Sequence, residues 1–310
     1  MPSVLGIDTS NYTTSAALWT DGAVLQKKLP LPVKPGTLGL RQRDAVFHHV
    51  VQLPSVLEAL PLAGAELAAL GASDRPRNRE GSYMPCFLAG LGAARAVAAA
   101  KGAPLFRFSH QQGHIAAALF SAGRLDLLKG RFLAFHVSGG TTEAVLVSPD
   151  PDAVFRTEIV ARSLDLKGGQ AVDRVGAMLG LPFPAGAKLE ALAAGTDRTF
   201  RIRPVLRGCD CSLSGIENQC RAMLERGEPK EEIAGFCLSA ILAALDGMAG
   251  RLLGRCGKLP LVFAGGVMSN GMIRTALSEK YGALFAAPEF AADNAAGVAV
   301  LAAVKGGILA

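Results

Sequence analysis

The chain has 310 residues, of which half are apolar and 19% are charged, and its formal net charge is +6 at pH 7. This composition excludes a disordered chain, and the length favours two lobes over one compact core. We expect no membrane span, because the apolar runs are too short, and no secretory signal. Six cysteines without a paired spacing favour a reduced, cytoplasmic location. The charge is compatible with a polyanionic partner, although the basic residues are scattered.

Two hairpins of similar sequence open the two halves of the chain. Residues 3–19 and 132–147 each combine an apolar strand, a small polar turn and a second strand, and the segments 13–18 and 141–146 match closely. A hairpin that recurs this far along predicts a duplicated α/β unit. Chance similarity between short strands rich in Thr, Ala and Leu is the alternative.

Helices are expected over 41–60 and 87–100, from Ser109 onward, over 175–179 and over 225–249. Within the first of these, His48 and His49 are expected to be partly exposed. Residues 72–83 form a charged segment that is expected to be a solvated loop, with phosphate contacts through its arginines as the alternative.

Two histidines open the helix that follows Ser109. His110 and His114 are four residues apart, so they lie on one helix face and their imidazoles can share a metal ion. Ser109 suits the N-cap of this helix. Asp293, an acid beside a helix start, is the best candidate for a third ligand, and such a set suits iron or zinc. A chance spacing of five histidines is the alternative.

Three turns carry groups that suit an anionic ligand. Ser138, Gly139, Gly140 and Thr141 form a glycine turn whose backbone N–H groups and hydroxyls suit phosphates. The turn at Asp8 resembles it, with Asp8 expected to hold a metal-bound water. Residues 263–271 combine a strand, a glycine pair and a helix start, which is typical of a nucleotide site. Any one glycine pair can also simply close a loop.

Taken in order, these segments resemble the TsaD/Kae/Qri family, the tRNA threonylcarbamoyladenosine-forming proteins formerly called O-sialoglycoprotein endopeptidases. The resemblance covers nearly the whole chain. Its motifs lie at 6–10, 43–44, 110–114, 137–142, 171–174, 183–186, 212–215, 265–270 and 293–294.

The resemblance implies an actin-like ATPase fold with two RNase-H-like lobes, which we place at 1–108 and 109–310, with the last helix packing back on the first lobe. It also implies one iron or zinc ion held by His110, His114 and Asp293. Catalytic roles are assigned to Asp8 and Ser138. The residues implied to line an adenine nucleotide are Ser138, Gly139, Gly140, Thr141, Asp173, Gly186 and Asn270.

The implied reaction transfers a threonylcarbamoyl group from threonylcarbamoyl-AMP to the adenosine beside the anticodon of tRNA. Family members work with an actin-like TsaB-type partner and a TsaE-type ATPase. A peptidase is disfavoured, because the His pair lacks the glutamate of H-E-x-x-H.

The chain departs from the family at three turns. The acidic turn of the family is replaced at 10–14, the histidine of its glycine turn is replaced by Thr141, and its G-P-G loop is replaced at 79–83. These changes indicate a diverged paralogue. Two alternatives therefore stay open: a carbamoyl or acyl transferase with a small-molecule acceptor, and a non-catalytic nucleotide-binding subunit.

Overall fold

The computed structural model describes residues 1–10, 12–32, 40–79, 81–292 and 295–309. These residues form two compact units. Unit 1 comprises 1–129, 149–156 and 287–310, and unit 2 comprises 130–148 and 157–286.

Unit 1 is built on a five-stranded sheet with the order β3-β2-β1-β4-β5. The first three strands are antiparallel neighbours, whereas β4 and β5 run parallel to β1. Because β1 is buried on both faces, its sequence is a continuous apolar run rather than an alternating one. The strands are β1 (Pro2–Asp8), β2 (Thr13–Thr20), β3 (Ala23–Pro30), β4 (Glu66–Arg75) and β5 (Leu105–Ser109).

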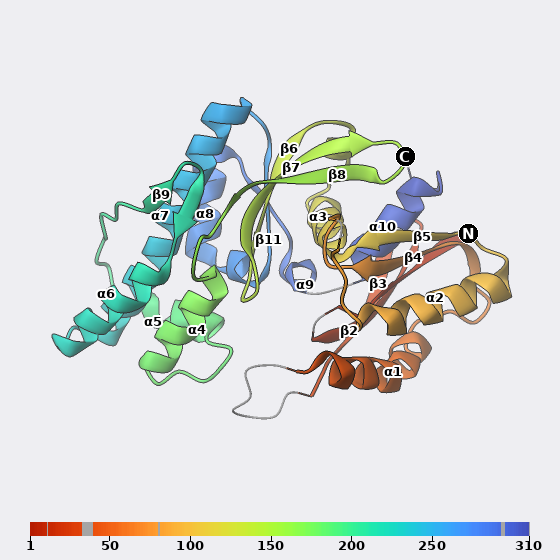
Figure 1. Cartoon of the computed structure of the whole chain (residues 1–310), viewed down its shortest axis with the longest axis horizontal. Coiled ribbons are helices and arrows are strands. Elements are labelled where there is room, and N and C mark those ends of the chain that lie inside the picture. Colours follow the sequence, from red (N-terminus) through yellow and green to blue (C-terminus); the bar gives the residue numbers. More distant parts are fainter. Residues whose placement is uncertain (11, 33–39, 80, 293–294, 310) are drawn as a thin grey trace. The chain divides into compact units, whose positions relative to one another are not determined.

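Helices cover both faces of this sheet (Figure 1). Leu5 and Leu70 pack on one side with Leu91 and Ala94 of the second helix. On the other side, a methyl group added at Gly6 would lie 2.6 Å from the backbone of the last helix, so that helix lies almost against the sheet. The helices of unit 1 are α1 (Gln42–Glu58), α2 (Phe87–Lys101), α3 (His110–Ser121), η1 (Leu125–Lys129), α9 (Pro288–Ala291) and α10 (Ala296–Lys305).

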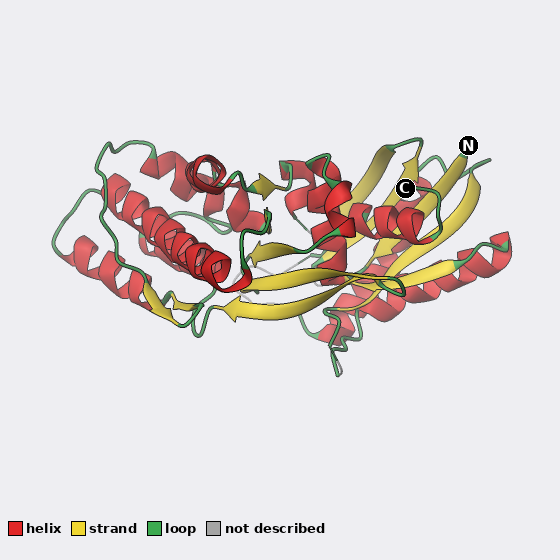
Figure 2. Ribbon diagram, turned by 90° about the horizontal axis from the view of Figure 1, so that it is seen from above, coloured by secondary structure: helices red, strands yellow, loops and turns green. Residues whose placement is uncertain are grey.

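Unit 2 repeats this topology, with the strand order β12-β11-β6-β7-β8. Again an antiparallel hairpin opens the sheet, and two parallel strands follow on its other side. The strands β7 and β8 form the long hairpin in Figure 2, whose tip at 149–156 belongs to unit 1. The sheet strands are β6 (Phe132–Val137), β7 (Thr142–Asp150), β8 (Val154–Arg162), β11 (Leu261–Ala264) and β12 (Leu284–Phe285).

The core of unit 2 lies between its sheet and α7 (Lys230–Cys256). This helix is long and apolar enough to cross a membrane, and 67% of its most apolar stretch is buried within the protein, as in the core helix of a globular unit. The helix expected over 225–249 is present here, but the expectation that all apolar runs are short overlooked its apolar length, because Asp246 interrupts the run. The remaining elements are α4 (Gly168–Met178), α5 (Gly186–Ala193), β9 (Val205–Arg207), β10 (Asp210–Ser212), α6 (Ser214–Glu225), η2 (Gly266–Ser269) and α8 (Gly271–Tyr281).

The matching topologies of the two sheets agree with the duplicated hairpin in the sequence. The helices expected near 41–60 and 87–100 are present as α1 and α2. The boundary expected after residue 108 differs from the compact units, because α3 and α10 pack with the first sheet and each other. His49 corrects another expectation: its side chain is fully buried, 2.8 Å from Thr14 Oγ1.

Candidate metal and nucleotide sites

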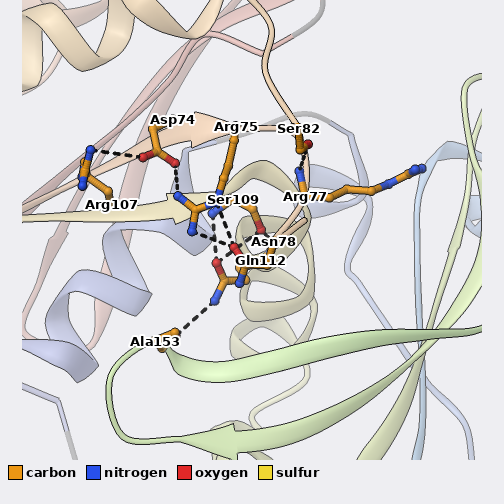
Figure 3. A network of polar contacts seen from close by, with 9 residues as sticks. All are labelled: Asp74, Arg75, Arg77, Asn78, Ser82, Arg107, Ser109, Gln112 and Ala153. Atoms are coloured by element: carbon orange, nitrogen blue, oxygen red, sulfur yellow. Dashed lines mark hydrogen bonds and ion pairs between the residues drawn. The ribbon is translucent and has the colours of Figure 1, made fainter. Parts of the chain in front are cut away.

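The first turn of α3 is held by a capping box. Ser109 Oγ accepts the backbone N–H of Gln112, and Gln112 Oε1 accepts the backbone N–H of Ser109 (Figure 3). Gln112 Nε2 also donates to the carbonyl oxygens of Ala153 and Phe155, at 3.0 and 2.9 Å. The start of α3, where both histidines lie, is therefore anchored to the tip of the β7–β8 hairpin.

The two histidines lie side by side, as the sequence spacing predicts. The Nε2 atoms of His110 and His114 are 3.0 Å apart. The side chain of His110 is 14% exposed and that of His114 is buried. Ser10 Oγ lies 3.5 Å from His110 Nε2. Two nearly buried imidazoles therefore direct nitrogen atoms to one point.

Asp8 contacts the far side of the His110 ring. Its Oδ2 lies 2.7 Å from His110 Nδ1, and its Oδ1 accepts the backbone N–H of Ser10 at 2.7 Å. The carboxylate is buried, with 1% exposure. A carboxylate acceptor holds the ring proton on Nδ1, so His110 Nε2 keeps a lone pair. In the structure Asp8 therefore contacts His110, whereas the sequence expectation was that Asp8 would hold a metal-bound water.

The donor set fits a divalent metal through its two histidines. Two nitrogens that each bind an ion at about 2.1 Å can be no more than about 4.2 Å apart, and the observed 3.0 Å satisfies this. Within the described ranges, no three His, Cys, Asp or Glu side chains form a metal cluster. Asp293, the expected third ligand, lies outside the described residues.

A close crossing of α3 and α10 supports the histidines from behind. A methyl group built at Gly297 would overlap the carbonyl oxygen of Gly113, the residue that precedes His114. Only glycine permits this approach of the two backbones. The position of His114 is therefore coupled to the packing of α10.

In unit 2, the glycine turn closes the β6–β7 hairpin. Ser138 N donates to Thr141 O at 2.7 Å, and Ser138 Oγ accepts Thr141 N at 3.2 Å. The Ser138 hydroxyl therefore stabilises the turn itself. Gly139 and Gly140 are exposed, and a side chain added at either would meet no neighbouring atom within 4 Å. These two glycines are the accessible part of the turn.

The N-terminus of α4 packs directly against this turn. Gly168 N donates to Thr142 Oγ1 at 2.8 Å, and Gly169 N donates to Ser138 O at 3.1 Å. A methyl group at Gly169 would lie 2.5 Å from Gly139 N, so the contact requires glycine. The first amides of α4 thus hold the turn in place, and the helix dipole adds positive potential beside Gly139.

The other expected nucleotide residues lie in the same unit: Gly186 and Asn270 at the starts of α5 and α8, and Asp173 in the middle of α4. Asp173 Oδ1 accepts the backbone N–H of Ala185 at 2.9 Å, next to the exposed Gly186. Asn270 Oδ1 accepts the backbone N–H of Ile273 at 3.0 Å, so this side chain caps α8.

Sequence reasoning missed Glu190. Its Oε1 accepts the backbone N–H of Gly271 at 2.6 Å and so links α5 to the start of α8. The feature in the sequence that could have revealed Glu190 is its position as an acid four residues after Gly186, one helical turn into α5. The contact joins the two helix starts at which Gly186 and Asn270 lie.

The charged segment 72–83 is not the solvated loop that was expected, because β4 extends to Arg75 and residues 74–78 are half-buried and held mostly by contacts within the segment. Arg75 donates to Asn78 Oδ1 from Nε and Nη2, at 3.1 and 2.7 Å, and pairs with Asp74 (Figure 3). Arg107 lies 3.7 Å from the other oxygen of Asp74. Arg75 therefore has a structural role.

Asp165 explains the polar turn at 212–215. Its carboxylate accepts Ser214 Oγ at 2.6 Å and the backbone N–H groups of Leu213 and Leu166, both at 2.7 Å. Partial burial raises the pKa of Asp165, but these hydrogen bonds outweigh it and lower the pKa below its usual value. The carboxylate fastens α6 to the end of β8.

The C-x-C segment at 209–211 contains ordinary thiols. None of the six cysteines, all of which lie in the described ranges, forms a disulfide, and burial raises the pKa of Cys211 to about 11. A thiol with this pKa is neutral at physiological pH and has little reactivity.

Comparison with known proteins finds relatives that align with nearly the whole chain. A family model described as TsaD, tRNA N6-adenosine threonylcarbamoyltransferase, matches residues 44–300. The protein of that name from Chelativorans sp. (strain BNC1) is 32% identical, over 96% of this chain and 88% of the relative. The one from Rhodospirillum rubrum is 31% identical, over 96% and 87%.

Solved structures agree on the fold. Component A of the Acidaminococcus fermentans (R)-2-hydroxyglutaryl-CoA dehydratase aligns with a TM-score of 0.55 at 18% identity, over 99% of this chain and all of the other. A ROK family glucokinase from Streptomyces griseus aligns with a TM-score of 0.51 at 13% identity, over 97% and 99%. At such identities the likeness shows the fold alone, which is the actin-like ATPase fold with two related lobes. Because the family model matches residues 44–300 of this chain, which is most of its length, the chain belongs to the TsaD family.

Proposed function

We propose that this protein is a transferase that moves a threonylcarbamoyl group from threonylcarbamoyl-AMP to the adenosine beside the anticodon of tRNA. The observation that carries the proposal is the pair of imidazole nitrogens 3.0 Å apart on α3, in a chain of this family. A protein that only binds nucleotide has no need of this pair. The retained pair therefore favours catalysis over a scaffolding role.

His110 and His114 would hold one iron or zinc ion, with Asp293 as the proposed third ligand. When bound, such an ion supplies Lewis-acid polarisation and charge neutralisation for the acyl phosphate. Asp8 keeps the proton of His110 on Nδ1, and the capping box of α3 keeps the ring in place. These residues act by orienting the donor nitrogens.

The nucleotide is proposed to lie on unit 2. The phosphate would bind at the exposed Gly139 and Gly140, in the turn that α4 holds in place. The dipole of α4 favours negative charge at this point. Gly186 and the carboxylate of Asp173 would border the nucleoside. Asn270 acts here by capping α8, and Ser138 by shaping the turn, rather than through direct chemistry.

In the proposed reaction, the exocyclic nitrogen of adenosine attacks the carbamoyl carbon. A nitrogen–carbon bond forms, the bond between that carbon and the phosphate oxygen breaks, AMP leaves and the nitrogen loses a proton. The contribution of the protein is to bring the acyl phosphate and the acceptor together in the right orientation. We place the reaction in the cytoplasm, with a TsaB-type protein and a TsaE-type ATPase as the proposed partners.

The test supplies the purified protein with the metal, threonylcarbamoyl-AMP and unmodified tRNA, with and without partner proteins. Mass spectrometry of the digested tRNA should detect modified adenosine, and the His114→Ala variant should produce none. If a standard family member modifies the tRNA under these conditions and this protein does not, the proposal fails. Consumption of the adenylate without tRNA modification would favour a small-molecule acceptor.

A further inference from the structure

A row of arginines follows the outer side of the segment that leads into β9. From 200 to 207, exposed and half-buried residues alternate, and Arg201, Arg203 and Arg207 are all exposed. We call these three residues the arginine row. Alternate residues of an extended chain lie about 7 Å apart, so the row covers about 20 Å. Its three guanidinium groups therefore project from one side of the chain.

The intervening residues hold this segment against the core. Phe200, Ile202 and Leu206 pack on the hydrophobic core of unit 2. Gly247 of α7 provides the room, because a methyl group there would lie 2.6 Å from Leu206 Cδ1 and 3.2 Å from Pro204 Cγ. Arg251 of α7 also donates to the carbonyl oxygen of Gly208. The arginine row therefore lies on a segment that packs on the core of unit 2, with Arg201 and Arg203 before β9 and Arg207 within it (β9 beside α7 in Figure 1).

The arginine row differs from its charged neighbours in its lack of acidic partners. Arg198, three residues before the row, pairs with Glu228 and Glu232, and Arg226 also pairs with Glu228. Within the described part of the chain, no ion pair or hydrogen bond engages the side chains of the row.

One acid lies close to the row. Asp210 is the strand partner of Arg207, and its Oδ1 accepts the backbone N–H of Arg162 at 2.8 Å. The guanidinium groups of the row thus keep their donors for an outside anion, and each offers the planar fork that matches phosphate.

We propose that the arginine row binds the sugar–phosphate backbone of tRNA. This inference rests on the proposed function, since it names the surface that holds the acceptor. An extended row of unpaired cations suits a strand that carries a negative charge every few ångströms, better than it suits a single small anion. The row provides affinity and orientation, and sequence selection falls to other contacts.

The test compares tRNA binding by the wild-type protein and the variant Arg201→Gln/Arg203→Gln/Arg207→Gln, by fluorescence anisotropy across about 50 to 200 mM salt. We expect the variant to bind roughly 10- to 100-fold more weakly at about 150 mM salt, and the slope of log affinity against log salt to fall by about 2 to 3. The corresponding triple Lys variant should keep most of the slope, because counterion release depends on charge.

A matched control removes three arginines that already have acidic partners. The variant Arg124→Gln/Arg221→Gln/Arg226→Gln makes the same change in net charge, and its arginines pair with Asp126, Glu217 and Glu228. The salt slope of the control should stay near that of the wild type. An equal loss in both variants would mean that only net charge matters and would overturn the assignment.

The two proposals can fail separately. If the wild-type protein binds tRNA and the row variant binds it with the same affinity and slope, the surface assignment is wrong and the proposed function stands. If the wild-type protein binds the adenylate but no tRNA, both the acceptor and the surface are wrong. AMP binding by the row variant should equal that of the wild type, which verifies that unit 2 is folded.

Discussion

Asp8 Oδ2 lies 2.7 Å from His110 Nδ1, on the opposite side of the imidazole from the nitrogen that faces His114. The carboxylate comes from the end of β1 and the histidine from the first turn of α3, 102 positions later. Because the acid is buried and also accepts the Ser10 N–H, its orientation is restricted. The pair therefore sets both the ring orientation and the position of the ring proton of His110.

Replacing Asp8 should weaken metal binding although Asp8 does not contact the metal in our assignment. Asp8→Ala removes the acceptor for the Nδ1 proton, so the His110 ring can rotate and change tautomer. We expect the metal dissociation constant to rise about 10- to 100-fold. Asp8→Asn should have a smaller effect, because the amide oxygen can still accept that proton. Competition with a chelator measures the constant for each variant.

Asp44→Asn is the control for this series, because Asp44 is a half-exposed acid of the same unit that pairs with Arg43. Its metal affinity should match that of the wild type. The assignment of Asp8 is wrong if Asp8→Ala retains wild-type affinity while His114→Ala loses the metal.

Gly297 offers a test of how α10 supports the histidines. In Gly297→Ala the new methyl group would overlap the carbonyl oxygen of Gly113, so α3 and α10 must separate. We expect a loss of about 1–3 kcal/mol in the free energy of unfolding, together with lower metal content. Denaturant titration and metal analysis of the same preparation measure both. Gly92→Ala, where a methyl group meets open space on the exposed side of α2, should leave the metal content unchanged and raise the free energy of unfolding by about 0.5–1 kcal/mol, because alanine favours a helix over glycine.

Gly140 of the glycine turn and Gly169 of α4, which packs against that turn, should respond differently to substitution. In Gly140→Val the side chain points into open space, so the fold should be unchanged and AMP affinity should fall by steric exclusion. In Gly169→Ala the methyl group meets Gly139 N at 2.5 Å, so both stability and AMP affinity should fall. Calorimetry with AMP and thermal unfolding separate the two effects. Unchanged AMP affinity in Gly140→Val would place the phosphate elsewhere.

Local patterns predicted the elements that are set by local interactions. The spacing of His110 and His114, the cap at Ser109 and the hairpins at 3–19 and 132–147 depend on residues close in sequence, and the structure contains all of them. A helix puts residues four apart on one face whatever lies around it. These features could therefore be identified before the fold was known.

Contacts between distant segments could not be predicted in this way. Asp8 meets His110, and Glu190 meets the start of α8, only because separate strands and helices pack together. Likewise, the sequence shows that basic residues are scattered, but the alternation that exposes Arg201, Arg203 and Arg207 depends on packing against α7. Burial of His49 follows from the packing of α1 on β2. Such partners require the tertiary structure.

The last prediction concerns Asp165 and the pH dependence of unit 2. The pKa of Asp165 is lowered in the folded state, so its carboxylate contributes stability above the unfolded value near 3.8 and loses that contribution as pH falls through the folded pKa. Asp165→Asn keeps the shape of the side chain but replaces the charged carboxylate, which accepts the hydrogen bonds of Ser214, Leu213 and Leu166, with a neutral amide. Because the carboxylate is partly exposed, we expect the variant to be about 1–2 kcal/mol less stable near pH 7. The difference should persist down to about pH 5 and shrink below about pH 4. Denaturant titrations at a series of pH values measure it, and a difference that stays constant to about pH 3 would show that the charge of Asp165 is not its source.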